Sequence, residues 1–211
     1  FPQKYETKCI ENLKEFANIS VREKSVCKTV AELTDKEVEN VLDPTLLLSA
    51  SRWLGIAKKP CNLPDKYVLV HMMEGCKYAT EKARALANGK GCKLVLVNPT
   101  LKQRQTCKDF VMYKAVSPEE FIGMFAEAEA VVTNSFHGAV FSLIFKKEFY
   151  AEASNAEKSS RITDLLELFG LSDRLLPNEK NRNTDWEKVN SILLKEQNKS
   201  VAWLKNSLEL N

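Results

Sequence analysis

The chain has 211 residues, of which 44% are hydrophobic and 28% are charged, and its formal net charge at pH 7 is +3. This composition is typical of a soluble globular protein, here expected as a single domain over residues 1–211, and the small net charge argues against nucleic acid as a partner. No apolar run approaches the roughly 20 residues that cross a bilayer, so we expect no transmembrane segment.

The six cysteines never form a CxxC pair, and several fall inside predicted helices or strands. In a chain of this size, the pattern favours reduced thiols in a cytoplasmic protein over a disulfide framework. With only two histidines and no paired cysteines, we expect no zinc or other bound metal.

Strand-like apolar runs alternate with helical patterns along the chain. We expect strands at 19–22, 38–42, 67–72, 93–97, 130–133 and 149–150. We expect helices at 10–16, 24–33, 76–88, 136–145, 162–169 and 184–209, with others beginning at 44 and 118, and the last one is polar and amphipathic. The alternation predicts an α/β fold with a mostly parallel sheet and helices on both of its faces.

Several short stretches carry helix start signals. Residues 117–120 (Ser-Pro-Glu-Glu) predict a capping box with proline at the first helical position, and residues 184–187 (Thr-Asp-Trp-Glu) predict a second one. Asp43, followed by proline, is expected to cap a helix. Ser159 or Ser160 is expected to cap the helix that contains residues 162–169.

A polar cluster follows the apolar strand that ends near residue 133. The residues Thr-Asn-Ser-Phe-His-Gly occupy positions 133–138, and helix-compatible apolar residues come next. At such a strand-to-helix turn, the first amides of the helix point beyond the strand end and can hold an anion. His137 could donate a proton there, and Gly138 would let a ligand approach the backbone closely. The alternative is a structural histidine that caps the helix or packs beside Phe136.

Other polar residues also lie at predicted strand or helix ends. Arg22 follows a short strand, and its guanidinium suits a carboxylate or phosphate, although an ion pair with Glu23 or another neighbour explains it equally well. Arg161, where a helix begins, is a second candidate for anion binding. His71 follows the apolar strand residues 67–70, and we expect it to be structural or peripheral. The chain has no Walker motif, no dinucleotide-binding glycine fingerprint and no GxSxG elbow.

Three segments together resemble the polysaccharide pyruvyl transferase family. They are residues 19–23 (Ile-Ser-Val-Arg-Glu), residues 41–48 (Val-Leu-Asp-Pro-Thr-Leu-Leu-Leu), and residues 131–149 followed by Ser-Ser-Arg at 159–161. The resemblance spans roughly residues 10–177. It implies two Rossmann-like halves arranged as in GT-B glycosyltransferases, with the active site between them. The segments found belong to the C-terminal half, so we expect the N-terminal half to be absent from this sequence.

The resemblance also implies a reaction, in which the pyruvyl group of phosphoenolpyruvate is transferred to two hydroxyls of a cell-surface polysaccharide sugar as a ketal. His137 would be the acid, or the hydrogen-bond donor to the departing phosphate, and Arg22 would hold the donor anion. The remaining donor-binding residues implied are Ser135, Phe136, Gly138, Ser160 and Arg161. This chemistry needs no metal or organic cofactor.

Two other functions are compatible with the same scaffold. One is a GT-B-type glycosyltransferase that uses a nucleotide-sugar donor, since fold alone does not separate the two reactions. The other is a non-catalytic binding or assembly module. Such a module would dock a partner of a cell-surface glycan pathway. For the pyruvyl transferase, the expected partners are phosphoenolpyruvate and a glycan acceptor, free or lipid-linked. The mild positive charge is compatible with peripheral association with a membrane.

Overall fold

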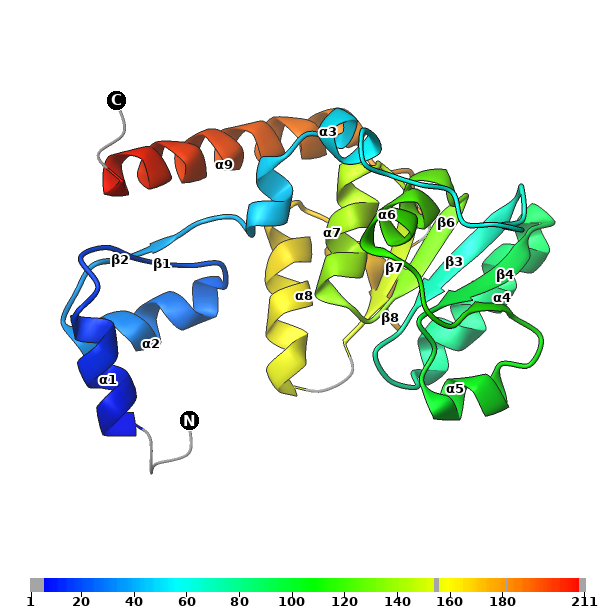
Figure 1. Ribbon diagram of the computed structural model, residues 1–211, viewed down its shortest axis with the longest axis horizontal. Helices are drawn as coiled ribbons and strands as arrows, with labels where there is room; N and C mark the ends of the chain where they lie inside the picture. Colours follow the sequence, from blue (N-terminus) through cyan, green and yellow to red (C-terminus); the bar gives the residue numbers. More distant parts are fainter. Residues whose placement is uncertain (1–5, 154–155, 181, 209–211) are drawn as a thin grey trace. The chain divides into compact units, whose positions relative to one another are not determined.

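The computed structural model describes residues 6–153, 156–180 and 182–208. The chain divides into two compact units, the first formed by residues 1–47 with 190–211 and the second by residues 48–189 (Figure 1). The two strands of the first unit pair only with each other and do not join the sheet of the second unit. The expectation that residues 1–211 form a single domain stays a prediction.

The second unit is built on a six-stranded sheet in the order β5-β4-β3-β6-β7-β8, and every pairing in it is parallel. The strands are β3 (Tyr67–His71), β4 (Lys93–Val97), β5 (Val111–Tyr113), β6 (Ala130–Thr133), β7 (Glu148–Glu152) and β8 (Leu175–Leu176). The helices are α3 (Ala50–Leu54), α4 (Lys77–Lys90), α5 (Leu101–Thr106), α6 (Pro118–Glu127), α7 (Phe136–Ile144) and α8 (Ala156–Leu168), with the 3-10 turn η3 (Ser172–Arg174). This strand order is that of the doubly wound Rossmann fold, and it reverses direction between β3 and β6.

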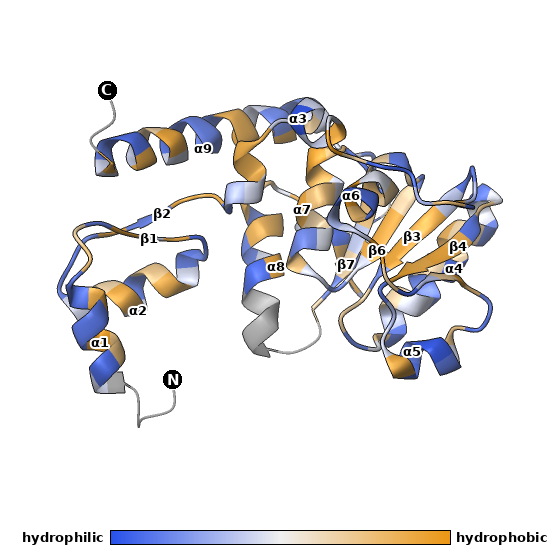
Figure 2. Cartoon of the chain, viewed as in Figure 1, coloured by the Kyte–Doolittle hydropathy of each residue, from blue (hydrophilic) through white to orange (hydrophobic). Residues whose placement is uncertain are grey.

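Helices cover both faces of this sheet, as the sequence predicts. On one face, Val68 and Val70 of β3 belong to a buried cluster with Ala79 and Ala83 of α4. On the other face, the Tyr67 hydroxyl donates to the backbone of α6 over 2.7 Å. Because β3 is covered on both sides, all five of its residues are buried, and its three central residues are apolar (Figure 2).

The first unit contains a small parallel βαβ element. Strands β1 (Ile19–Val21) and β2 (Val38–Asn40) are connected through helix α2 (Lys24–Thr34), and α1 (Glu6–Lys14) precedes them. The C-terminal helix α9 (Trp186–Ser207) contributes most of its length to this unit. The Ser200 hydroxyl on α9 accepts from the amide of Leu42 over 2.9 Å, so residues 158 positions apart hold the unit together.

Three predicted helix starts need correction. The segment after Asp43 forms only the four-residue 3-10 turn η2 (Pro44–Leu47). Helix α8 begins at Ala156, so Ser159 and Ser160 lie inside it and do not cap it. Helix α9 is capped by Asp185, which accepts from the Lys188 amide over 3.0 Å; the Thr184 hydroxyl is not the cap, because it accepts from Arg174 instead.

The capping box at Ser117 is confirmed, with both reciprocal hydrogen bonds formed. The sequence prediction missed β5, β8, α3 and α5, each at most six residues long. Among the described residues, no helix combines the length and the apolar character needed to span a membrane.

Candidate functional site

The turn between β6 and α7 lies where the strand order of the sheet reverses. His71, the last residue of β3, pairs in register with Thr133, the last residue of β6. β3 and β6 are neighbours in the sheet (Figure 1). In open parallel sheets, ligands bind beyond the carboxyl ends of the strands at this point. The structure therefore places the polar cluster of the sequence at the position where this fold offers a binding site.

Hydrogen bonds fix this turn to the end of β3. The Thr133 hydroxyl donates to the carbonyl of His71 over 2.7 Å, and the Asn134 amide donates to the same carbonyl over 3.3 Å. The side-chain oxygen of Asn134 then accepts from the Met73 amide over 2.7 Å. Two neighbouring strand ends, which come from distant parts of the sequence, are thereby held in one arrangement.

Ser135 and Gly138 shape the first turn of α7. Ser135 is the N-cap, and its hydroxyl accepts from the Gly138 amide over 3.5 Å. Gly138 is buried, and a Cβ atom there would lie 2.2 Å from the Thr133 hydroxyl oxygen. The contact explains the glycine by the close packing of α7 on β6, and the approach of a ligand to this backbone stays a prediction.

His137 is exposed on the first turn of α7. Its ring lies edge-on to the ring of Phe136, with centroids 5.4 Å apart. The helix dipole places partial positive charge at this end of α7, and the first-turn amides of Phe136 and His137 point beyond the helix. An exposed imidazole beside a helix N-terminus can contact an anion that binds there from solvent.

His71 lies at the same strand ends, and the sequence suggested a structural or peripheral role for it. It is 8% exposed, and its ring packs edge-on against Phe121 of α6 with centroids 4.9 Å apart. Burial, and to a lesser extent the charge of His137, lowers the pKa of His71 to about 4. Its relation to His137 could not be read from local patterns, because His71 ends β3 whereas His137 lies in helix α7, after β6.

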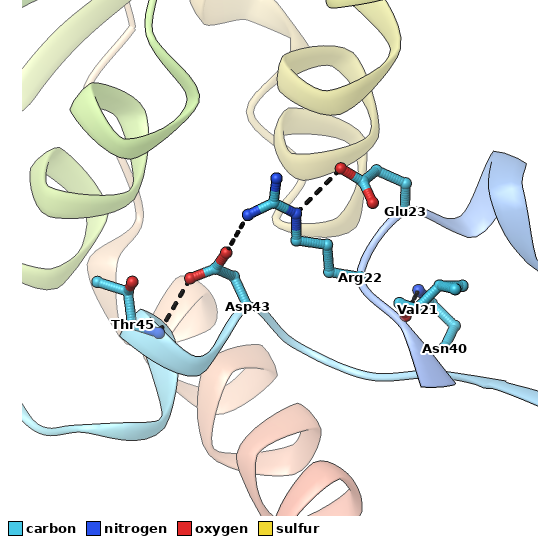
Figure 3. Close-up of polar contacts among 6 residues, drawn as sticks. All are labelled: Val21, Arg22, Glu23, Asn40, Asp43 and Thr45. Atoms are coloured by element: carbon cyan, nitrogen blue, oxygen red, sulfur yellow. Dashed lines mark hydrogen bonds and ion pairs between the residues drawn. The ribbon is translucent and has the colours of Figure 1, made fainter. Parts of the chain in front are cut away.

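Arg22 lies in the first unit, where it forms an ion pair with Asp43 (Figure 3). The distance from its Nη1 to the Asp43 carboxylate is 2.6 Å, and its Nε donates to Glu23 over 3.0 Å. The side chain of Asp43 is only 4% exposed, and its second oxygen accepts from the Thr45 amide over 3.0 Å. Burial opposes the charged form, but the hydrogen bonds to the two carboxylates raise the pKa of Arg22. Asp43 therefore both caps η2, as the sequence predicts, and positions Arg22.

A pocket of about 430 Å³ lies beside Arg22, within the first unit. It opens beyond the carboxyl ends of β1 and β2, and α9 forms part of its wall. Its lining includes Val21, Arg22, Glu23, Leu47, Ser200 and Trp203. The lining combines the ion pair of Arg22 and Glu23 with apolar side chains, which suits a small ligand with some carbon surface.

Arg161 and Ser160 lie in α8. Arg161 is the sixth residue of that helix and is half-buried, so it does not sit at the helix start where the sequence placed it. The side chain of Ser160 is outside the described residues.

Within the described residues, no group of three or more histidine, cysteine, aspartate or glutamate side chains could hold a metal ion. The six cysteines are all thiols, and burial raises the pKa of Cys76 to about 11.

The parallel sheet and the order of its strands define a Rossmann-like α/β protein, with a polar cluster at the strand ends where the order reverses. A model of the polysaccharide pyruvyl transferase family matches residues 1–155, and the chain belongs to this family. The match covers both Arg22 and the β6–α7 turn, and it confirms the resemblance found in the sequence. No curated protein sequence gives a significant match to the chain.

A solved structure supports the same fold. The UDP-GlcNAc 2-epimerase of Methanocaldococcus jannaschii, in complex with UDP-GlcNAc and UDP, aligns with a TM-score of 0.55 and 16% identity, over 86% of this chain. The chain spans about half of that protein, 54% of its length. The wall teichoic acid polymerase TagF gives a TM-score of 0.45 and 11% identity, over all of this chain and 57% of its own. At 16% identity, the likeness to the epimerase shows the fold alone, which is that of a Rossmann-like half of the GT-B kind.

Proposed function

We propose that the protein transfers the pyruvyl group of phosphoenolpyruvate to a sugar of a cell-surface polysaccharide, forming a ketal. The observation that carries this proposal is the exposed His137 at the N-terminus of α7, where the sheet order reverses, in a chain of the pyruvyl transferase family. Phosphoenolpyruvate carries two anionic groups and a carbon that must be protonated, so it needs an anion site with an acid beside it.

In this proposal the α7 N-terminus binds the donor phosphate. The amides of Phe136 and His137 and the Ser135 hydroxyl face it, while Gly138 lets α7 pack closely on β6. His137 protonates the methylene carbon of the donor, or donates a hydrogen bond to the departing phosphate. Both roles require an imidazole that solvent and substrate can reach, and the exposure of His137 supports this.

Arg22 is proposed as a donor-binding group of the first unit. Asp43 and Glu23 hold its guanidinium at the edge of the 430 Å³ pocket. Its fixed charge suits the carboxylate or phosphate of the donor. Arg161 and Ser160 are proposed as helpers from α8.

The reaction balances without a metal or an organic cofactor. Protonation of the donor methylene gives a methyl group and an electron-poor carbon that one sugar hydroxyl attacks. Phosphate leaves, the second hydroxyl adds to the same carbon, and a ketal forms. Of the two hydroxyl protons, one ends on the methyl group and the other on phosphate. We propose that this occurs in the cytoplasm on a glycan acceptor, free or lipid-linked, with any membrane contact peripheral.

One contact argues against a nucleotide-sugar donor bound in the dinucleotide manner. Such donors place their pyrophosphate at the helix after the first strand of the sheet, through a glycine-rich turn. Here that helix is α4, and the Glu152 carboxylate accepts from its Ala79 amide over 2.6 Å. A carboxylate at this helix end repels a pyrophosphate, whereas Ser135 at the α7 end carries no charge.

The test is ligand-dependent stability of the full chain, measured by thermal unfolding with phosphoenolpyruvate and, separately, with UDP and CDP. Phosphoenolpyruvate at 100 times its dissociation constant should stabilise the protein by about 2.7 kcal/mol. Neither His137→Gln nor Arg22→Gln should show this stabilisation. Phosphate release with a panel of methyl glycosides, followed by NMR detection of the ketal, then tests transfer.

Two control variants separate binding from general damage. Arg84→Gln removes a guanidinium that pairs with an exposed carboxylate, Asp109 at 2.9 Å, and Lys102→Gln removes an exposed charge on α5. Both should respond to phosphoenolpyruvate as the wild type does. Stabilisation by a nucleotide alone would point to glycosyl transfer, and no response to any of these ligands would point to a non-catalytic module.

A further inference from the structure

His71 is a buried polar residue to which the proposed reaction gives no role. Its side chain carries a buried Nδ1 atom that has no hydrogen-bond partner among the described residues. Folded proteins leave few buried polar atoms without a hydrogen-bond partner, and each such atom needs an explanation, such as a functional site. An apolar residue of the same size would fill this place in the core without that cost.

The ring lies on the face of the sheet that α7 covers. Side chains alternate along β3, so His71 shares a face with Tyr67, whose hydroxyl donates to α6. The His71 ring contacts Phe121 of α6, and Phe121 packs on Phe141 of α7 with centroids 6.0 Å apart. Phe141 lies four residues after His137, on the same side of α7. His71 and His137 therefore occupy one side of the sheet at neighbouring strand ends.

The backbone connects the two residues as well. The carbonyl of His71 accepts from both Thr133 and Asn134, which begin the turn that carries His137. His71 is thus attached to the anion site by a strand pairing and two hydrogen bonds.

The protonation state of the His71 ring also suits hydrogen bonding to a ligand. With its pKa lowered to about 4, His71 is neutral at pH 7. A neutral imidazole has one donor and one acceptor nitrogen. It can hydrogen-bond a substrate without bringing a charge into the buried core.

We propose that His71 is a further substrate-binding residue of the β6–α7 site, and that its imidazole hydrogen-bonds phosphoenolpyruvate held at the N-terminus of α7. The inference rests on the proposed function, since the ligand is the donor of that reaction. It adds a residue from β3 to a site that otherwise comes from β6 and α7.

Ring-nitrogen NMR tests the proposal on the unaltered protein. The chain has only two histidines, so ¹⁵N-histidine labelling gives two sets of ring signals, which His137→Gln assigns. Phosphoenolpyruvate should move a ring-nitrogen signal of His71 as well as those of His137. A response of His137 alone would overturn the inference and leave the donor proposal intact. No response from either histidine would overturn both.

A substitution series gives a second, independent readout. His71→Leu keeps the apolar contact with Phe121 but removes the hydrogen-bonding atoms. We expect it to be at least as stable as the wild type at pH 7, with affinity for phosphoenolpyruvate reduced about tenfold to a hundredfold. His71→Asn or His71→Gln, which keep a polar group near one of the ring nitrogens, should recover part of that affinity. A His71→Leu protein that is less stable but binds phosphoenolpyruvate normally would show a purely structural residue. If this variant fails to fold, the NMR titration decides.

Discussion

At the residue scale, the absence of a side chain at Gly138 allows α7 to pack closely on β6. Its Cβ position lies 2.2 Å from the Thr133 hydroxyl oxygen and 2.9 Å from the Thr133 Cβ. Gly138→Ala must therefore displace α7 or β6, and we expect a loss of roughly 1–3 kcal/mol in the free energy of unfolding, measured in urea. The variant should also lose its response to phosphoenolpyruvate, because the first turn of α7 moves.

Gly89 is the matched control for this prediction. It lies near the end of α4, with nothing within 4 Å of its Cβ position. Gly89→Ala should stabilise the protein by about 0.5–1 kcal/mol, since alanine is the better helix former. Equal effects of the two substitutions would contradict the close packing of Gly138 on Thr133.

The burial of His71 predicts a dependence of stability on pH. Its pKa is about 4 in the folded protein, against 6.5 for an unperturbed histidine, so between these values the unfolded chain binds a proton that the folded chain does not. Stability must therefore fall as the pH drops below about 6.5, by about 1.4 kcal/mol per pH unit down to about pH 4. From pH 7 to pH 5, the wild type should lose about 2 kcal/mol more than His71→Leu does in urea unfolding. Parallel pH profiles would show that the folded protein accommodates a charged His71.

The candidate site was only partly predictable from single residues. Thr133, Ser135 and His137 were identified because they follow one another at the end of an apolar run. The role of His71 depends on Thr133, 62 positions away, and on Phe121 of α6. Local patterns carry no information on such partners, because a strand pairing is set by the fold of the whole sheet.

At the scale of elements, the long apolar segments were predicted and the short ones were missed. β3, β6 and α7 are buried along most of their length, so their sequences are almost continuously apolar. β5 and β8 are the edge strands, with three and two residues. These are too few to show the alternation of apolar and polar residues by which a strand is recognised in sequence. α5 has six residues and escaped notice for the same reason, although Thr100 and Gln103 form a complete capping box.

The start of α9 offers a prediction at this scale. The sequence favoured Thr184 and Glu187 as a capping box, whereas the structure assigns the cap to Asp185. Asp185→Ala should cost about 1 kcal/mol of stability, and Glu187→Ala, at an exposed position, should cost less than half of that. Urea unfolding of both variants checks this, and a larger effect of Glu187→Ala would restore the capping box inferred from sequence.

At the scale of the whole molecule, the chain combines two units of very different construction. The second has a six-stranded sheet whose central strands are fully buried. The first has two strands of three residues, and only Ile19 among them is buried. This division was not predictable, because both units contain the same alternation of strand and helix. The two units are distinguished by their strand pairing, because β1 and β2 pair with each other and not with the six-stranded sheet.

The difference in construction predicts unequal local stability. A two-stranded sheet is marginal by itself, and local opening free energy follows the number of buried apolar contacts. In native-state hydrogen exchange of the full chain, amides of β1 and β2 should therefore exchange well before those of β3 and β6. Phosphoenolpyruvate should add protection at residues 131–141, since a ligand at the α7 N-terminus opposes opening of that turn. Equal protection of all four strands without ligand would mean that the two units unfold as one, because amides that open only together share one opening free energy.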